Sequence, residues 1–221
     1  MFNTHHGLLD TYVNGSLRSM SKIVYLHGFN SSPASFKAQQ LARLMQAIGL
    51  PEAALIPQLD NDPAKATANL EQLIKGLERP LLVGSSLGGF YATYFAERFN
   101  LEAVLINPAV APHRLFKDRL GVQVNYHTGQ QWQLTQAHVD ALAALEVPAP
   151  TAGQRIEVWL QTGDETLDYR HAQQYYQGCL LDIEQGGDHS YQGFAQKLGR
   201  ILKRAGICEQ AWRDFDFLTL D

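Results

Sequence analysis

The chain has 221 residues, of which 45% are hydrophobic and 18% are charged, and its formal net charge is −4 at pH 7. This balance is typical of one globular α/β domain with a substantial core. No block of like charges points to nucleic acid or a membrane surface, and no apolar run approaches the roughly 18 residues of a membrane span. The two cysteines, Cys179 and Cys208, favour free thiols in a reducing compartment over a disulfide framework.

The first 19 residues are polar and lack the apolar stretch of a secretory signal. We expect residues 1–19 to be an extension outside the core, or Met20 to be the true start of the protein. Residues 20–221 are expected to form a single domain, and the adjacent pair His5-His6 is expected to be inert rather than to bind metal. Without targeting signals, the cytoplasm is the expected location.

Short apolar runs alternate with amphipathic segments from residue 23 onward. The first run, Ile23-Val-Tyr-Leu26, is β-branched and aromatic and predicts a buried strand. Further strands are predicted at 53–57, 80–85, 102–107, 155–161 and 179–184, with helices at 33–49, 62–78, 87–99, 167–177 and 191–204. Such alternation predicts a mostly parallel sheet of about six strands with helices on both faces.

The helix at 33–49 has a clear pattern of its own. Ser32 and Pro33 are typical of an N-cap and a first helical position. Apolar residues recur at three- and four-residue spacing, which predicts an inward face made of Phe36, Leu41, Leu44, Met45 and Ile48.

Residues 108–150 interrupt the alternation after the fourth strand. They contain a predicted helical piece at 113–120, a polar, turn-rich stretch at 121–132 and a helix at about 135–146. An insertion here would overhang the carboxyl ends of the strands, where ligands bind in such sheets. We interpret it as a small cap, and a packing excursion without substrate contact is an equal alternative. After residue 207, a tail is expected to dock through Trp212, Phe215, Phe217 and Leu218.

A strand, a sharp turn and a helix follow one another at Gly84-Ser-Ser-Leu-Gly88. This is the context of a G-x-S-x-G nucleophile elbow, in which the central serine, Ser86, is exposed at the end of the sheet. The glycines allow the strand and the helix to approach closely. Ser85 is the rival nucleophile, but the register of the two glycines favours Ser86. A Gly/Ser-rich loop without chemistry is the alternative for these five residues alone.

Two later loops carry an acid and a base. Asp164 and His189 each follow a predicted strand, so both loops lie at the same sheet edge as Ser86. The order Ser, Asp, His is that of the α/β-hydrolases. Serine needs a base to take its proton, histidine can be that base, and a carboxylate orients the imidazole. The rival acids are Asp188, which adjoins His189 and more plausibly shapes the turn, and the weaker candidates Glu165 and Asp168.

An oxyanion hole requires two N–H donors. The backbone N–H of Leu87 opens the elbow helix, and the backbone N–H of Phe29 follows Gly28 in the loop after the first strand. Phe29 and Trp132 are candidate walls of the substrate pocket. His27 is interpreted as structural, and no histidine shows the spacing of a metal site. The glycine patterns match no nucleotide-binding fingerprint.

Five motifs recur in order, namely His27-Gly-Phe-Asn-Ser-Ser-Pro33, Gly84-Ser-Ser-Leu-Gly-Gly-Phe-Tyr-Ala92, Ile106-Asn-Pro-Ala109, Thr162-Gly-Asp-Glu165 and Gly186-Gly-Asp-His189. From about Lys22 to Arg204 the chain resembles the compact bacterial α/β-hydrolases of the YqiA-like esterase family. The resemblance implies a small α/β-hydrolase fold without the first antiparallel strands of larger members. It also implies serine esterase activity on simple acyl esters, with Ser86, Asp164 and His189 as the triad.

The expected function is therefore hydrolysis of carboxylic esters of small or acyl-chain substrates through an acyl-enzyme. An acyl-CoA thioesterase is the first alternative and a non-catalytic, hydrolase-like binding protein the second. The mechanism calls for no metal and no organic cofactor. The expected partner is a small ester or thioester rather than nucleic acid.

Overall fold

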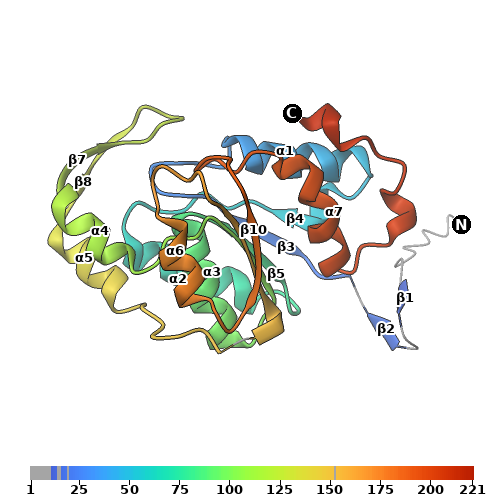
Figure 1. Cartoon of the computed structure of the whole chain (residues 1–221), viewed down its shortest axis with the longest axis horizontal. Helices are drawn as coiled ribbons and strands as arrows, with labels where there is room; N and C mark the ends of the chain where they lie inside the picture. Colours follow the sequence, from blue (N-terminus) through green and yellow to red (C-terminus); the bar gives the residue numbers. More distant parts are fainter. Residues whose placement is uncertain (1–10, 14–15, 19, 152) are drawn as a thin grey trace, which may run out of the picture.

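A six-stranded parallel sheet forms the centre of the protein in a computed structural model that describes residues 11–13, 16–18, 20–151 and 153–221 (Figure 1). The strand order is β10-β9-β6-β5-β3-β4, and every neighbouring pair is parallel. The sheet confirms the predicted fold class. Its strands are β3 (Ile23–Leu26), β4 (Ala54–Leu55), β5 (Leu81–Ser85), β6 (Ala103–Ile106), β9 (Ile156–Gln161) and β10 (Leu180–Glu184).

Helices cover both faces of this sheet (Figure 1). They are α1 (Phe36–Ala47), α2 (Pro63–Lys75), α3 (Leu87–Phe99), α4 (Pro112–Phe116), α5 (Gln136–Ala143), α6 (Tyr169–Tyr175) and α7 (Phe194–Arg204). Short 3-10 turns are η1 (Pro51–Ala53), η2 (Lys117–Arg119), η3 (Gly153–Arg155), η4 (Glu209–Ala211) and η5 (Phe217–Leu220).

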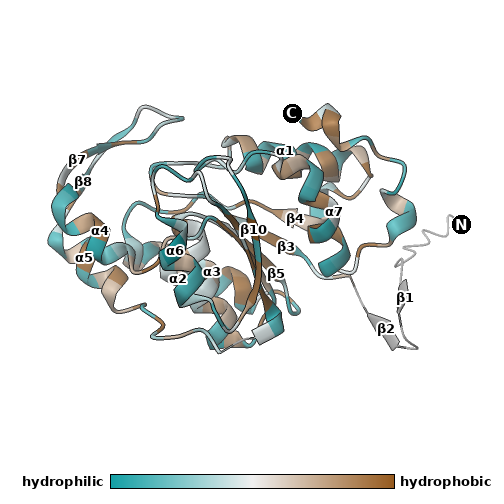
Figure 2. Cartoon of the chain, viewed as in Figure 1, coloured by the Kyte–Doolittle hydropathy of each residue, from teal (hydrophilic) through white to brown (hydrophobic). Residues whose placement is uncertain are grey.

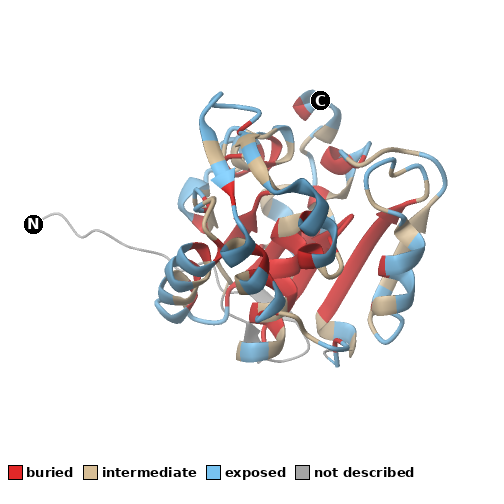
Figure 3. Cartoon of the chain, turned by 90° about the vertical axis from the view of Figure 1, so that its left-hand side faces the viewer, coloured by how far each residue is buried: buried red, intermediate tan, exposed pale blue. Residues whose placement is uncertain are grey.

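Alternating side chains of the strands divide the core into two layers. In β3, Ile23 and Tyr25 pack with α1 and α7, whereas Val24 and Leu26 pack with α2 and α3. This is the two-residue period of a strand that is buried on both faces. The four central strands, β3, β5, β6 and β9, accordingly run through the middle of the molecule and are buried along their whole length (Figures 2 and 3).

The order of the strands creates a switch point between β3 and β5. From β3 the chain moves outward to the edge strand β4, and it then returns to place β5 on the other side of β3. Ligands bind at such points, beyond the carboxyl ends of the strands. The loop after β3 and the turn after β5 meet there.

The first helix begins later than the sequence predicted. Helix α1 has Ser35 as its N-cap, and Ser32 instead accepts a hydrogen bond from the Ala34 amide at 3.1 Å. Leu41, Leu44 and Met45 are buried as expected, but the inward position predicted for Phe36 is wrong, because its side chain is 60% exposed. Phe36 is the first residue of α1, and the residues of α1 that pack against the sheet begin later, at Ala38.

Residues 108–150 contain more regular structure than expected. The predicted helix at 113–120 is α4 followed by η2. Helix α5 buries Val139 and Leu142 as predicted, and Leu145 is buried just beyond the end of α5. The stretch predicted as turns holds two antiparallel strands, β7 (Gly121–Val124) and β8 (Gln131–Leu134). This hairpin extends from the end of the molecule that α4 and α5 occupy (Figure 1). Its role as a cap stays a prediction.

The two ends of the chain differ in what the structure describes. In the tail, Trp212, Phe215 and Phe217 are partly buried against the core as expected, but Leu218 is 66% exposed and Leu220 is buried instead. Strands β1 (Thr11–Val13) and β2 (Ser16–Arg18) pair with each other, apart from the central sheet. The other predictions for residues 1–19, including His5-His6, lie outside the described residues. In the described ranges, no helix has the length and apolar character to cross a membrane.

The packing of α3 on β3 leaves no room for a side chain at Gly88. A Cβ there would lie 2.0 Å from the Leu26 carbonyl oxygen. We expect Gly88→Ala to lower the free energy of unfolding by about 3 kcal/mol, the upper end of the usual cost of overpacking. Gly76→Ala is the control, since a Cβ there meets only an ordinary 3.4 Å contact. Urea denaturation measures both, and equal midpoints would contradict the close approach.

Candidate active site

Ser86 occupies a strained turn between β5 and α3. Its backbone has φ 55° and ψ −120°, a conformation that a residue with a side chain rarely adopts and that costs about 1–3 kcal/mol. Backbone hydrogen bonds hold the turn: the Ser86 amide donates to the carbonyl of Ile106, and the Ser86 carbonyl accepts from the amides of Gly89, Phe90 and Ala109. The strain is therefore imposed by β6 and α3, and it presents the hydroxyl beyond the sheet.

The hydroxyl of Ser86 is hydrogen-bonded to His189. The distance from Ser86 Oγ to His189 Nε2 is 3.1 Å, and on the other side of the ring His189 Nδ1 lies 2.8 Å from Asp164 Oδ2. Because a carboxylate can only accept, Nδ1 carries the ring proton and Nε2 presents its lone pair to the serine. The structure thus brings the three predicted residues into one chain of hydrogen bonds.

Asp164 is fixed from behind by its own loop. Its Oδ1 accepts hydrogen bonds from the amides of Thr166 and Leu167 at 2.9 and 2.8 Å, and its side chain is 2% exposed. A carboxylate held by two amides cannot turn away from the imidazole. The loop sequence after β9 therefore determines where Nδ1 of His189 must point.

The rival residues have other partners. The side chain of Ser85 is hydrogen-bonded to Tyr25, whose pKa is raised by burial and partly lowered by this bond. Asp188 accepts from Gln192, and Asp168 caps α6 and pairs with Arg170. Glu165 accepts from the backbone amide of His189 at 3.0 Å, and so it holds the loop rather than the ring.

Two buried polar residues that the sequence did not reveal tie the His189 loop to the sheet. Asn107, at the end of β6, donates to the carbonyl of Asp188 at 2.9 Å and accepts from the amide of Gln161 at 3.0 Å. Gln161, the last residue of β9, accepts from the amides of Asp188 and Gln192 and donates to the carbonyl of Gln192. The sequence placed both residues at the ends of predicted strands, and Asn107 also within the motif Ile106-Asn-Pro-Ala109, but it assigned a role to neither.

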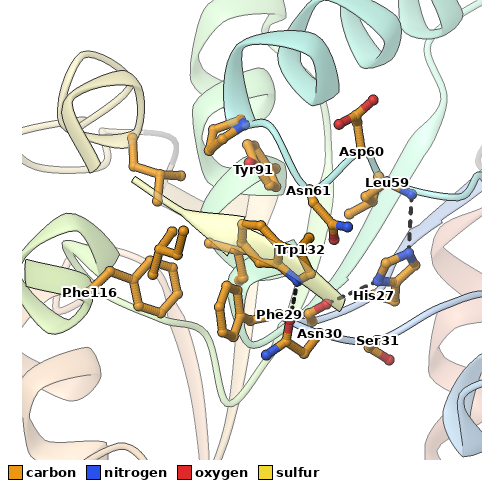
Figure 4. A pocket seen from close by; sticks show the side chains of 15 residues that line it. His27, Phe29, Asn30, Ser31, Leu59, Asp60, Asn61, Tyr91, Phe116 and Trp132 are labelled. Carbon is orange, nitrogen blue, oxygen red and sulfur yellow. Dashed lines mark hydrogen bonds between the residues drawn. The ribbon is translucent and has the colours of Figure 1, made fainter. Parts of the chain in front are cut away.

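His27 orients the loop after β3. Its Nε2 accepts from the Leu59 amide at 3.1 Å, so Nδ1 carries the proton and donates to the Gly28 carbonyl at 3.0 Å (Figure 4). Burial lowers the pKa of His27, which keeps the ring neutral. In a trans peptide the C=O and the next N–H point in opposite directions, so a carbonyl held by His27 turns the Phe29 N–H away from His27.

This loop also lies against the serine. A Cβ on Gly28 would stand 3.2 Å from Ser86 Cβ and 3.7 Å from Ser86 Oγ. Any side chain at position 28 would therefore compete for the space beside the hydroxyl. Leu87 begins α3 directly after Ser86, where helical N–H groups lack intrahelical acceptors.

A cavity of about 430 Å³ opens above the serine. Ser86, His189, Phe29 and Leu87 all line it, together with side chains of α1, α4 and the loop after β7. Its size is within the usual range for sites that bind small molecules. The sheet edge, the start of α1 and the 108–150 segment therefore enclose one space.

Trp132 lies on the far side of Phe29 from this cavity. The two rings meet edge to face at 5.6 Å, and Trp132 lines a smaller cavity with His27, Tyr91 and Phe116 (Figure 4). Phe29 borders both cavities, and its ring centroid is 4.4 Å from that of Phe116. The pocket roles of Phe29 and Trp132 stay predictions.

Asn30 joins the loop after β3 to the hairpin. Its Oδ1 accepts from Trp132 Nε1 at 2.8 Å, and its carbonyl accepts from the Tyr126 amide at 2.8 Å. Asn125 adds a hydrogen bond to the carbonyl of Ser31. The hairpin is therefore attached to the loop that carries the Phe29 amide.

Within the described part of the chain, no group of three or more His, Cys, Asp or Glu side chains is placed to hold a metal ion.

The architecture defines the class as the α/β-hydrolase fold. Alpha/beta hydrolase domain-containing protein 10 from mouse has a TM-score of 0.64 at 13% identity, over 83% of this chain and 88% of that one. Est1E from Butyrivibrio proteoclasticus has 0.61 at 15% identity, over 84% and 85%. The monoacylglycerol lipase of Paleococcus ferrophilus has 0.56 at 13% identity, over 83% and 93%. At these identities the likeness shows the fold.

The family follows from a second comparison. Residues 22–205 match the family described as "Uncharacterised protein family (UPF0227)". The chain belongs to this family, which is the YqiA family that its motifs indicated.

The hydrogen bonds of Asn107 give a test of the loop attachment. We expect Asn107→Asp to lower the free energy of unfolding by about 2–3 kcal/mol at pH 7, because a carboxylate would face the carbonyls of Asp188 and His189 without a donor. Asn69→Asp, on the exposed face of α2, is the matched control and should change little. Urea midpoints measure both, and a stable Asn107→Asp protein would show that the loop is held elsewhere.

Proposed function

We propose that the protein is a serine hydrolase that cleaves a carboxylic ester through an acyl-enzyme. The observation that carries the proposal is the chain of hydrogen bonds from Ser86 Oγ through His189 to Asp164. Geometry of this kind is what a serine needs to become a nucleophile, since its hydroxyl is otherwise too weak. The site lies at the switch point of the sheet, where α/β folds bind ligands.

The first half of the reaction forms the acyl-enzyme. Ser86 Oγ attacks the acyl carbon while His189 Nε2 takes its proton, and His189 then gives that proton to the leaving alcohol. Asp164 stays ionised and stabilises the imidazolium. In the second half, water attacks the acyl-enzyme, His189 again takes the proton, and Ser86 Oγ leaves with it.

The negative charge on the acyl oxygen requires two donors. The amides of Leu87 and Phe29 are proposed to supply them, because one opens α3 behind the serine and the other follows Gly28, which lies against it. His27 supports this role by fixing the Gly28 carbonyl and with it the direction of the Phe29 amide. Losing one such donor typically costs about 2.7–4 kcal/mol of transition-state stabilisation.

Several observations favour an ester as the substrate. The cavity above Ser86 has apolar walls that suit an acyl group, among them Leu115 and Phe116 of α4. Two proteins of similar fold are named as the esterase domain of a Rhodothermus marinus protein and as a monoacylglycerol lipase. The 108–150 segment, which contributes Arg119, Tyr126 and His127 to the cavity, is proposed to act as its cap.

A thioester would be cleaved by the same residues. Comparing the turnover of a butyryl ester, a butyryl thioester and a butyryl anilide distinguishes ester, thioester and amide substrates. The proposal also holds that residues 20–221 form a single domain and that the reaction requires no cofactor. A non-catalytic binding protein is the remaining alternative, and it is an outcome of the next experiment.

Labelling with a fluorophosphonate probe tests the nucleophile. We expect the wild type and Ser85→Ala to label and Ser86→Ala not to label, with ester turnover lowered more than about 1,000-fold only in Ser86→Ala. Ser85→Ala is the matched control because Ser85 bonds Tyr25 instead of His189. A folded wild type that neither labels nor turns over esters would favour the binding-protein alternative.

The assignment of the acid is tested by removing one charge. We expect Asp164→Asn to lower kcat by about 1,000- to 10,000-fold, because an amide would no longer hold the Nδ1–H tautomer of His189. Asp188→Asn is the control, since its carboxylate bonds Gln192. Steady-state kinetics on a 4-nitrophenyl ester measures both, and a larger loss in Asp188→Asn would reverse the assignment.

A further inference from the structure

The charged side chains that line the cavity above Ser86 are cationic. Lys37 and Arg119 line it, whereas no Asp or Glu is among its lining residues in the described part of the chain. Within that part, no carboxylate lies within ion-pair distance of either cation. A cationic cavity in a protein with a net charge of −4 is a local feature that the overall charge does not predict.

Lys37 is hydrogen-bonded to the loop that carries His189. It is the second residue of α1, and its Nζ donates a hydrogen bond to the carbonyl of Ser190 at 2.6 Å. Burial lowers the pKa of Lys37 to about 8, although the charges of Asp188 and Asp164 act in the opposite direction. An ammonium has three donors, so one bond to a carbonyl leaves it able to bind an anion. A bound anion would also compensate the cost of burying the charge.

The start of α1 adds donors beside this lysine. The N-cap, Ser35, makes no side-chain bond to the helix, and its Oγ is buried without a hydrogen-bond partner among the described residues. Ser35 and Phe36 line the cavity together with Lys37. The first turn of a helix carries N–H groups and a partial positive charge that favour anions.

The position of Lys37 indicates which part of the substrate carries the anion. His189 must reach the leaving-group oxygen, so the leaving group lies on the His189 side of the acyl carbon. Lys37 bonds the carbonyl of Ser190, the residue after His189, and its ammonium therefore lies on that side. The apolar side chains of Leu115 and Phe116 line the same cavity from α4 and suit the acyl part.

We propose that the substrate is an ester whose leaving group carries an anionic group, a carboxylate or a phosphate, that Lys37 and the first turn of α1 bind. This inference rests on the proposed serine hydrolase. It makes Lys37 a residue that determines substrate specificity, and Arg119, which is exposed at the cavity, a second cation that attracts the anion.

Matched esters with one acyl length test the proposal. The neutral reference is 4-nitrophenyl butyrate, and 3-carboxy-4-nitrophenyl butyrate and a phosphate-bearing phenyl butyrate place the anion on the leaving group. The monoester of glutarate with 4-nitrophenol places it on the acyl part. Each kcat/KM is divided by that of the neutral ester, and comparing this ratio between variants cancels the intrinsic reactivity of the leaving group.

In Lys37→Gln, we expect the ratio for the leaving-group anions to fall about tenfold or more, as for a lost charge-assisted hydrogen bond. The glutarate ratio should stay constant, and Lys37→Arg should retain most of the preference. Lys117→Gln removes an exposed lysine of η2 that does not line the cavity, and it is the control that leaves all rates unchanged. In the wild type, the preference should weaken as salt is raised.

The result that overturns the proposal is an equal fall for all substrates in Lys37→Gln, which would show that Lys37 only supports the Ser190 carbonyl. A fall in the glutarate ratio alone would also overturn it. If the ratio falls by different amounts for the carboxylate ester and the phosphate ester, the larger fall identifies the anion that Lys37 binds. Neutral-ester turnover that survives Ser86→Ala would instead refute the proposed function, so the two failures are distinguishable.

Discussion

The close approach of α3 to the centre of the sheet is the constraint on which the site depends. Where Gly88 passes the end of β3, backbone lies against backbone, and the turn between β5 and α3 can only close with Ser86 in a strained conformation. That single contact places the serine hydroxyl, the Leu87 amide and the start of α3 together. The other loops at this edge of the sheet then need only reach Ser86, whose position is already determined.

The His189 loop reaches that point across two strands. It leaves the edge strand β10, and β9 and β6 lie between it and β5. Asn107 and Gln161, at the ends of those intervening strands, bind its backbone at successive positions. Buried side-chain amides are suited to this task because each offers both a donor and an acceptor. The sheet therefore supports the histidine through polar side chains that bond the backbone of its loop.

The features that could be predicted from the sequence are those encoded by residues close together in the chain. The parallel sheet follows from alternating runs, and the sharp turn at Ser86 follows from glycines at fixed spacing. Lys37 was missed because its partner, Ser190, lies far along the chain and only the fold brings them together. Phe36 was misplaced because helical periodicity does not show where the first turn begins. Strands β7 and β8 were missed because each has only four residues, too few for the alternation of polar and apolar side chains to stand out in a turn-rich stretch. Asn107 was predicted at the end of a strand and within a family motif, but its bond to the His189 loop joins residues far apart in the chain.

The attachment of the hairpin to Asn30 has a consequence for how this scaffold can change. Segments that border a pocket are usually the parts of an enzyme that can be exchanged to alter selectivity. Here Trp132 and Tyr126 bond the same loop that carries the Phe29 amide. Under the proposed function, grafting a different hairpin would therefore change selectivity and turnover together, unless the graft keeps these two anchors. Laboratory evolution of this segment should accordingly find coupled rather than independent substitutions.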